Sequence, residues 1–367
     1  MSQLADVFKV KWQAFNLRRF LVFGVILGLL ILVGVLPDER RYFLSAIFGL
    51  LFVALSDPGG KHGPRVAKMA VMAVAGALLT ALAFGIGAGA WGWVVLAAFV
   101  VTLLSGLAVK YGAHRFVAAY LLNAWFIIAL SLQTLISFHA PGLYSSGLIH
   151  AQAWKQALAW LIGSALWLAY ATIMWLARGR APQPQPVAEI PGDISPRPLT
   201  RPLILFAVIR AVAVSIAVAI SFGLKLPDAD WMAIAAIITM KPSLQQSTLA
   251  AEQRVAGTIV GAAVAVLVLL PVDNITALEV IVVVLLALGA AIRTMSYTFY
   301  TAAIAAAVLI AADVPDPSNL SHEGRRILFT LAGVGIAIIV MLLAGLLQKH
   351  TTKTADKAPR KPQASPA

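Results

Sequence analysis

The chain has 367 residues, of which 60% are hydrophobic and only 12% are charged, and it contains no cysteine. Charged residues make up about a quarter of a soluble domain, so this composition indicates a polytopic helical membrane protein. The absence of cysteine excludes disulfides, thiolate metal sites and iron–sulfur clusters. The formal net charge of +13 is assigned to loops on the cytoplasmic side, and no nucleic-acid partner is expected.

Apolar segments that could cross a bilayer as helices recur along the chain, and we count twelve of them. The first six are expected at about 20–36, 42–56, 66–87, 91–109, 116–137 and 154–177. After a proline-rich polar segment, the second six are expected at about 203–224, 230–241, 254–271, 276–293, 297–312 and 326–347. The predicted fold class is therefore all-α, a polytopic transmembrane helical bundle.

These spans divide the chain into four parts. Residues 1–177 are predicted as the first six-helix membrane repeat and 178–200 as a cytoplasmic proline-rich linker. Residues 201–347 are predicted as the second six-helix membrane repeat, and 348–367 as a disordered basic cytoplasmic tail. Most of the 28 lysines and arginines lie in the two terminal segments, the linker and the loops on the same side of the membrane as these. The positive-inside rule places that side in the cytoplasm, so both termini are predicted to be cytoplasmic.

The two halves share a sequence pattern. The segment "YFLSAIFGLLFVALSDPGGKHGPRVAK" from Tyr42 aligns without gaps on "WMAIAAIITMKPSLQQSTLAAEQRVAG" from Trp231, which places Arg65 opposite Arg254. Because each half has six spans, both halves have the same orientation, and we expect two parallel six-helix repeats.

A shorter pattern, Arg-x-x-x-Thr-x-x-Gly, occurs twice within the second half. Its two copies are three spans apart, and an odd number of spans gives the copies opposite directions, which is compatible with inverted three-helix sub-repeats. The copies consist of Arg254, Thr258 and Gly261, and of Arg326, Thr330 and Gly333.

Motifs for catalysis are missing from the sequence. It contains no Walker lysine motif, no HExxH and no Ser/His/Asp grouping, so we predict neither an enzyme nor a cofactor or metal site. The acidic residues, Glu279 among them, are expected at span ends or in loops, whereas the charge inside and beside the spans is positive. This distribution favours an anionic substrate.

Arg210 is the charged residue expected deepest in a span. It lies seven residues after the predicted start at 203, which is about 10 Å at roughly 1.5 Å per residue. A lone arginine at that depth costs about 3 kcal/mol on insertion scales, so we expect it to face the bundle interior or a wet cavity. The alternative is that the side chain snorkels to the headgroups.

The polar interruption at 238–261 is the second candidate site. Pro242 cannot donate a backbone hydrogen bond and disfavours helix at Lys241, so the helix is expected to end or unwind there. Ser243 and further polar residues follow, and Arg254 opens the next helix, where the macrodipole favours an anion. The alternative is an ordinary cytoplasmic loop whose lysine and arginine only set the topology.

Four segments of the second half resemble the membrane module of the fusaric acid resistance and aromatic acid exporter (FUSC-like) family. They are "PLILFAVIRAVAVSIAVAI", "DWMAIAAIITMKPSLQQST", "RVAGTIVGAAVAVLVLLP" and "RRILFTLAGVGIAIIVMLL". The resemblance covers most of 200–347, with a more diverged copy over about 18–177, where Lys68 and Met69 replace the Gly-Thr pair. It implies a bacterial inner-membrane exporter of aromatic carboxylates, often working with a periplasmic adaptor protein.

The leading hypothesis is a multi-pass inner-membrane efflux transporter of small organic anions, such as aromatic carboxylic acids, that works by alternating access. A non-transporting scaffold that binds lipid or a partner protein is the alternative, a channel is a third hypothesis, and a homo-oligomer is left open. The residues expected to bind substrate are Arg210, Trp231, Lys241, Ser243, Arg254, Thr258, Tyr297 and Tyr300. Those expected to act as hinges or in packing are Pro242, Gly257, Gly261, Arg326, Thr330 and Gly333.

Overall fold

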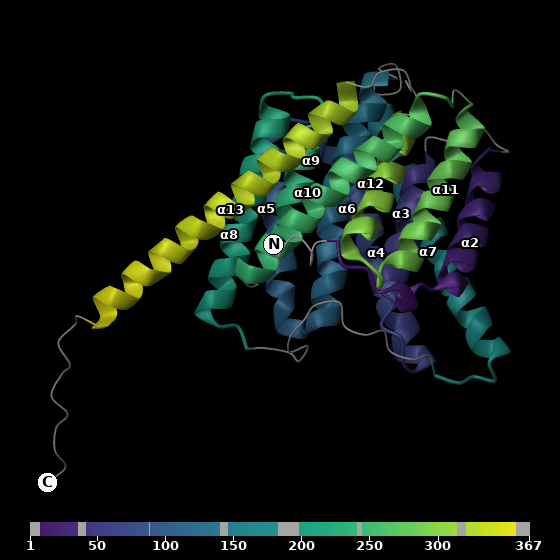
Figure 1. Ribbon diagram of the computed structural model, residues 1–367, viewed down its shortest axis with the longest axis horizontal. Helices are drawn as coiled ribbons and strands as arrows, with labels where there is room; N and C mark the ends of the chain where they lie inside the picture. Colours follow the sequence, from purple (N-terminus) through teal and green to yellow (C-terminus); the bar gives the residue numbers. More distant parts are fainter. Residues whose placement is uncertain are drawn as a thin grey trace, which may run out of the picture.

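The computed structural model describes residues 8–35, 42–87, 89–139, 146–182, 198–240, 244–272, 274–313 and 321–356. Within these ranges the chain forms twelve α-helices and two short 3-10 helices, η1 (Trp12–Ala14) and η3 (Ala108–Tyr111) (Figure 1). The prediction of an all-α helical bundle is confirmed for this part of the chain.

The helices follow the order of the predicted spans. The first half contains α2 (Leu17–Val35), α3 (Phe43–Leu55), α4 (His62–Ile86), α5 (Trp91–Leu107), α6 (Ala113–His139) and α7 (Ser146–Ala177). The second half contains α8 (Arg201–Gly223), α9 (Asp230–Thr239), α10 (Leu244–Leu269), α11 (Ile275–Ile292), α12 (Tyr297–Asp313) and α13 (Ser321–Asp356).

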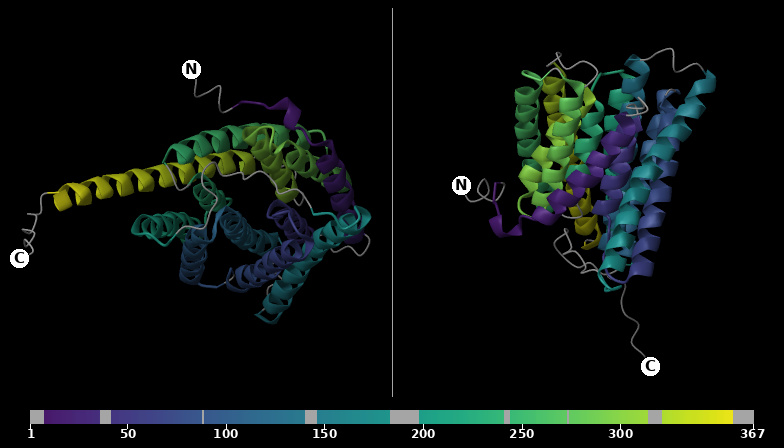
Figure 2. Two further views of the ribbon diagram at one scale, coloured as in Figure 1. Left: turned by 90° about the horizontal axis from the view of Figure 1, so that it is seen from below. Right: turned by 90° about the vertical axis from the view of Figure 1, so that its right-hand side faces the viewer.

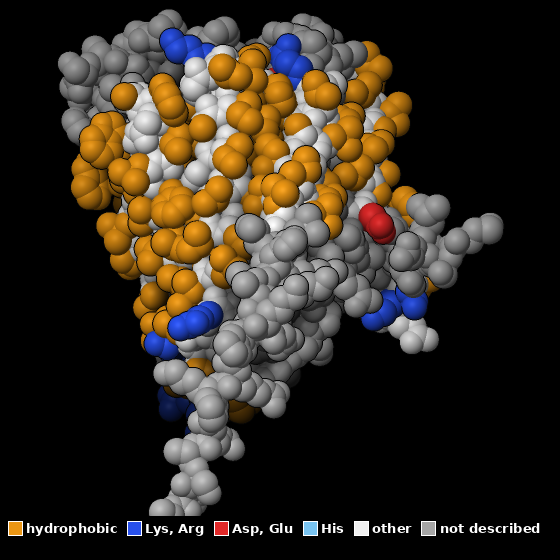
Figure 3. Space-filling model, turned by 90° about the vertical axis from the view of Figure 1, so that its left-hand side faces the viewer, with side chains coloured by type: hydrophobic (Ala, Val, Ile, Leu, Met, Phe, Trp, Pro, Cys, Tyr) orange, Lys and Arg blue, Asp and Glu red, His pale blue; other side chains and the backbone are white. Residues whose placement is uncertain are grey.

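The outer surface of the bundle is suited to lipid. Seven helices of the described chain are long and apolar enough to cross a membrane, and α3 and α9 are among the shorter apolar helices. On the face drawn in Figure 3, hydrophobic side chains cover a broad central band, with lysine and arginine above and below it. A band of this kind between charged margins is typical of a multi-pass membrane protein.

The two halves lie against each other. In Figure 2, α3 to α7 gather on one side of the bundle and α9 to α13 on the other. At one edge α5 of the first half packs along α8 of the second, and at the opposite edge α11 of the second half packs along α2 of the first (Figure 1). Each half therefore completes its packing with a helix of the other half.

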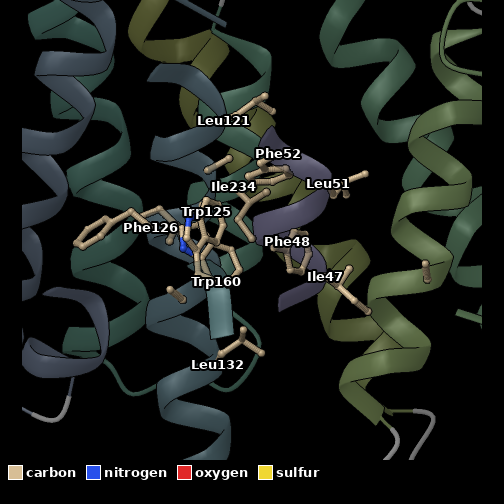
Figure 4. Packing of buried hydrophobic residues seen from close by; sticks show 14 of the residues in the cluster. Ile47, Phe48, Leu51, Phe52, Leu121, Trp125, Phe126, Leu132, Trp160 and Ile234 are labelled. Carbon is tan, nitrogen blue, oxygen red and sulfur yellow. The ribbon is translucent and has the colours of Figure 1, made fainter. Parts of the chain in front are cut away.

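The core of the first half is built around two fully buried tryptophans, Trp125 and Trp160, whose ring centres are 4.7 Å apart (Figure 4). Each indole N–H has an acceptor, since Trp160 donates to the carbonyl of Ala73 at 2.9 Å and Trp125 donates to Thr80 Oγ1 at 2.7 Å. Two large side chains can therefore be buried here without leaving a polar group unsatisfied.

Glycines let the helices of this core approach closely. A Cβ atom on Gly163 of α7 would overlap the carbonyl oxygen of Ala46 on α3, and one on Gly76 of α4 would overlap the Trp160 ring. In the second half, a Cβ atom on Gly333 of α13 would overlap the carbonyl oxygen of Met232 on α9. In both halves the last helix therefore carries a glycine where it packs on the short second helix.

Several helices extend beyond the predicted limits, and the largest extensions are those of α10 and α13. The structure begins α10 at Leu244, ten residues before the predicted start, so the polar residues after Ser243 are helical rather than unwound. Leucine, alanine, glutamine and glutamate favour helix, and the segment contains neither glycine nor proline. Likewise α13 continues to Asp356 into the segment predicted as a disordered tail, because the first proline beyond it is Pro359.

Candidate functional site

The break after α3 is closed by a buried ion pair. Arg65, in the first turn of α4, uses Nε to donate to Asp57 Oδ1 at 2.7 Å and Nη2 to donate to Oδ2. The carboxylate also accepts hydrogen bonds from Gly59 N at 3.0 Å and from Trp167 Nε1 at 3.4 Å. Arg65 is 4% exposed and Asp57 11%, so both charges are removed from water and compensate each other.

The break after α9 is described only in part. α9 ends at Thr239, and Met240 is extended (φ −75°, ψ 104°), which is the conformation expected before an interruption. Lys241, Pro242 and Ser243 lie outside the described residues. Arg254 lies in the helical backbone of α10, but its side chain is not among those described.

Arg210 lies inside the bundle, not at its surface. Its side chain on α8 is 0% exposed. Nη1 donates to Ser105 Oγ on α5 at 3.2 Å, and the guanidinium carbon lies 5.5 Å from the Tyr120 ring centre and 5.9 Å from the Phe116 ring centre, both on α6. The side chain therefore faces the bundle interior, which was the first of the two interpretations drawn from the sequence. It does not snorkel to the headgroups.

The charge of Arg210 is poorly compensated by these contacts. Among the described residues, neither Nε nor Nη2 of its guanidinium has a hydrogen-bond partner. Desolvation of an ion in a protein costs several kcal/mol. A contact with an aromatic ring returns about 2 kcal/mol at a desolvated site, and the neutral hydroxyl about 1.5–3 kcal/mol. Two of the three guanidinium nitrogens are left without an acceptor in the described part of the chain.

A second buried polar residue lies one helical turn from this group. Asn123 of α6 is fully buried, and its Oδ1 accepts a hydrogen bond from Thr102 Oγ1 of α5 at 3.1 Å. Its Nδ2 has no hydrogen-bond partner in the described part of the chain. Because Thr102 and Ser105 are three residues apart on α5, as Tyr120 and Asn123 are on α6, all four line the same α5–α6 interface.

Trp231 and Arg326 meet at the opposite end of α9 from the break. The guanidinium carbon of Arg326 lies 6.0 Å from the Trp231 ring centre. Arg326 Nε also donates to Asp228 Oδ1 at 3.2 Å, and Arg325 Nε donates to Oδ2 of the same carboxylate at 3.1 Å. This cluster joins the α8–α9 turn to the start of α13 and is separate from the surroundings of Arg210.

The remaining predicted residues of the second half lie on α10, α12 and α13. Thr258 and Thr330 are buried, and their hydroxyl groups have no hydrogen-bond partner among the described atoms. Gly257 and Gly261 face α12, because Cβ atoms there would overlap Thr301 and approach the Ala302 carbonyl oxygen to 2.7 Å. They therefore lie at a close contact between two helices.

Tyr297 and Tyr300 open α12, with their ring centres 6.0 Å apart. The guanidinium carbon of Arg293 lies 5.9 Å from the Tyr300 ring centre. Beside them, the backbone N–H of Lys11 donates to the Met295 carbonyl at 2.9 Å, so the N-terminal segment covers the α11–α12 turn. The structure does not bring these rings to Arg210, whose contacts come from α5 and α6.

Several of these charged and polar residues were not identified from the sequence. Asp57, eight residues before Arg65, could have been found by looking for a counterion next to the aligned arginine. Ser105 and Asn123 carry no local signal, because they become neighbours of Arg210 only through packing of distant helices. Glu279 lies near the start of α11, as expected of a span end, but its side chain is buried.

A group of residues suited to a metal ion is not found in the described part of the chain, where no three His, Asp or Glu side chains gather.

Comparison with known proteins supports the resemblance seen in the sequence. Residues 195–340 match the family model described as fusaric acid resistance protein-like. No curated protein and no solved structure matches the chain. The matched segment begins just before α8 and ends within α13, so it includes Arg210, Trp231 and Arg254. The second half of this membrane protein is thus similar to the fusaric acid resistance protein-like family.

Proposed function

We propose that the protein is an efflux transporter of the bacterial inner membrane that exports small organic anions, in particular aromatic carboxylic acids, by alternating access. The observation that carries the proposal is a pair of short, buried helices at matching positions in the two halves. α3 has 13 residues and α9 has 10. At 1.5 Å per residue they extend about 20 and 15 Å, whereas the hydrocarbon core is about 30 Å thick.

Short or interrupted helices at corresponding positions of two repeats are the feature that most often marks a transporter's substrate site. Here each short helix is followed by a break and then by a helix that carries an aligned arginine, Arg65 in α4 and Arg254 in α10. Backbone that is not helical at membrane depth is tolerated where it lines a cavity or is enclosed by protein.

The two breaks differ in charge, which favours the second as the anion site. Asp57 neutralises Arg65 in the first half. The residue aligned with Asp57 in the second half is Gln246, an amide that carries no charge. Position 246 therefore supplies no carboxylate to Arg254 or the nearby Lys241. An anionic substrate would supply the negative charge that Asp57 supplies in the first half.

A parallel repeat of two six-helix units with twelve spans accounts for the way the halves pack. The fourth helix of the first half, α5, packs on the first helix of the second, α8, and the reciprocal pair is α11 with α2. Such an exchange is expected for two repeats related by an axis along the membrane normal, and it allows the halves to rock about a site between them. With the lysine- and arginine-rich segments on the cytoplasmic side, both termini are cytoplasmic.

We assign the substrate contacts within this framework. Lys241 and Arg254 attract the carboxylate at the break after α9, where Ser243 and Thr258 orient it. Arg210 attracts a carboxylate at a second place, formed by α5, α6 and α8. Tyr297 and Tyr300 form the aromatic wall at the break, and Trp231 faces the substrate from the opposite end of α9. Pro242, Gly257, Gly261, Thr330 and Gly333 set the helix break and the close helix contacts. Arg326, which lies beside Trp231, holds the α8–α9 turn through Asp228.

The proposal is tested by the accumulation of radiolabelled benzoate in an efflux-deficient bacterium. Cells would express the intact protein, Arg254→Ala or the control Arg201→Ala, an exposed arginine at the start of α8, all at matched membrane levels. We expect lower accumulation with the intact protein and the control, and accumulation equal to that of the empty vector with Arg254→Ala. Equal accumulation in all strains would contradict export, and export by Arg254→Ala would contradict the assigned site.

A further inference from the structure

We propose that Arg210 binds the carboxylate group of a small ligand with an apolar body, in a site formed by α5, α6 and α8. The described contacts of Arg210 come from α5 and α6, whereas the break after α9 lies between α9 and α10. The inference rests on the proposed function, since it names a binding site within the same transporter and the class of substrate that this site would take.

The molecule itself shows how its arginines hold a carboxylate. Arg65 binds Asp57 through the edge of the guanidinium formed by Nε and Nη2, and each of these nitrogens donates to one carboxylate oxygen. In Arg210 the same edge, Nε and Nη2, has no hydrogen-bond partner among the described residues, while Nη1 is held by Ser105. The guanidinium of Arg210 is thus fixed by one nitrogen and presents the pair suited to bidentate binding of a carboxylate.

The described residues offer no internal counterion for this edge. Among the described residues, the guanidinium donates to the hydroxyl of Ser105 and lies over two aromatic rings, of Phe116 and Tyr120. None of these groups carries a negative charge at neutral pH. Since the side chain is 0% exposed, headgroup phosphates and bulk water do not reach it in this arrangement.

The surroundings of the guanidinium favour a ligand with an apolar body and a polar substituent. Phe116 is buried beside it, and the buried α8 residues about one turn before and after Arg210 carry small apolar side chains (Ala207, Ala213 and Val214). One turn along α6, Asn123 Oδ1 accepts a hydrogen bond from Thr102 Oγ1. Its Nδ2 has no partner among the described atoms and can donate to an acceptor on the ligand. An aromatic carboxylate fits this combination of donors and apolar walls.

The site lies between the two halves, which gives it a place in a transport cycle. α5 and α6 belong to the first half and α8 to the second, and the two halves are closely packed here, since a Cβ atom on Gly106 would come within 2.8 Å of Ala207 Cβ. A ligand therefore reaches Arg210 only when α5 and α8 separate. Binding at this site would favour the separated arrangement of the halves.

The test is calorimetric titration of the full chain with benzoate in nanodiscs of neutral phosphatidylcholine. We expect the unmodified protein to bind benzoate at least tenfold more tightly than its neutral analogue benzamide. Arg210→Met and Arg210→Lys should each weaken benzoate binding at least tenfold, because lysine keeps the charge but lacks the two-nitrogen edge. The exposed arginine of the same helix supplies the control, Arg201→Met, which should bind benzoate as the unmodified protein does.

A second variant keeps the inference testable if Arg210→Met fails to fold. Ser105→Asp places a carboxylate next to the guanidinium, so it should abolish the part of benzoate binding that depends on Arg210 and raise the thermal unfolding midpoint. Benzoate binding that is unchanged in Arg210→Met or Ser105→Asp, or no binding by the unmodified protein, would overturn the inference.

Transport of benzoate by the same preparations, measured in liposomes, separates the two proposals. Binding that depends on Arg210 without any transport would leave the site intact and refute the exporter. Transport and binding that are both unchanged in Arg210→Met would leave the exporter intact and refute the site.

Discussion

The ion pair between Asp57 and Arg65 provides a quantitative test of how the break after α3 is held. The change is Asp57→Asn, which keeps the side-chain volume and removes the charge. Arg65 is 4% exposed and lies bidentate on this carboxylate, so the variant leaves an uncompensated buried cation. Breaking a buried pair from one side costs about 3–5 kcal/mol, and we expect a loss of this size in the free energy of unfolding.

The measurement is unfolding in mixed micelles by titration with a denaturing detergent, followed by tryptophan fluorescence. Arg65→Met and the double variant complete a thermodynamic cycle. Each single change breaks the same ion pair, so we expect the double variant to lose less than the sum of the single losses, by about 1–3 kcal/mol. In Arg65→Met, Asp57 would still accept hydrogen bonds from Gly59 N and Trp167 Nε1. Lys68→Gln, at an exposed position of the same helix, is the control and should change stability by less than about 0.5 kcal/mol. Additive single losses, or an unchanged Asp57→Asn, would refute the reasoning.

Two further predictions use neighbouring residues as matched pairs. Gly333→Ala should destabilise the protein by about 1–3 kcal/mol, because the added Cβ would overlap the Met232 carbonyl, whereas Gly335→Ala has open space and should be neutral or stabilising by up to about 1 kcal/mol. Detergent-induced unfolding measures both, and equal effects would show that α13 does not depend on this contact. Arg326→Gln should cost about 1.5–3 kcal/mol because its partner Asp228 lies with it in the interior, while Arg325→Gln should cost about 0–1 kcal/mol because Arg325 is 35% exposed. Thermal unfolding of the two variants compares them, and a larger loss for Arg325→Gln would contradict the burial argument.

The positions of the helices were largely predictable, and their ends were not. Runs of apolar residues determine which segments can lie in a membrane, and each predicted span corresponds to one helix of the structure. The start of α10 at Leu244 and the end of α13 at Asp356 were missed because both extensions are polar. Hydropathy does not detect a polar segment that has good helix formers and no glycine or proline.

The candidate site was predictable at single residues but not as an environment. Arg210 stood out because an arginine inside an apolar run is costly wherever the helix lies. Its contacts with Ser105 and Tyr120 join residues that are far apart in the sequence, on helices whose neighbours are set by tertiary packing. Asp57 and Arg65 are close in sequence, but only the loop between α3 and α4 brings their charged ends together.

Counterflow in proteoliposomes is the measurement that tests the central claim most directly. Liposomes containing the purified full chain would be loaded with unlabelled benzoate and diluted into a trace of labelled benzoate. A transporter that alternates between two open states should accumulate the label transiently above equilibrium, and Arg254→Ala should not. A channel would equilibrate the label without overshoot, and a scaffold would leave it outside, so either result would contradict the account.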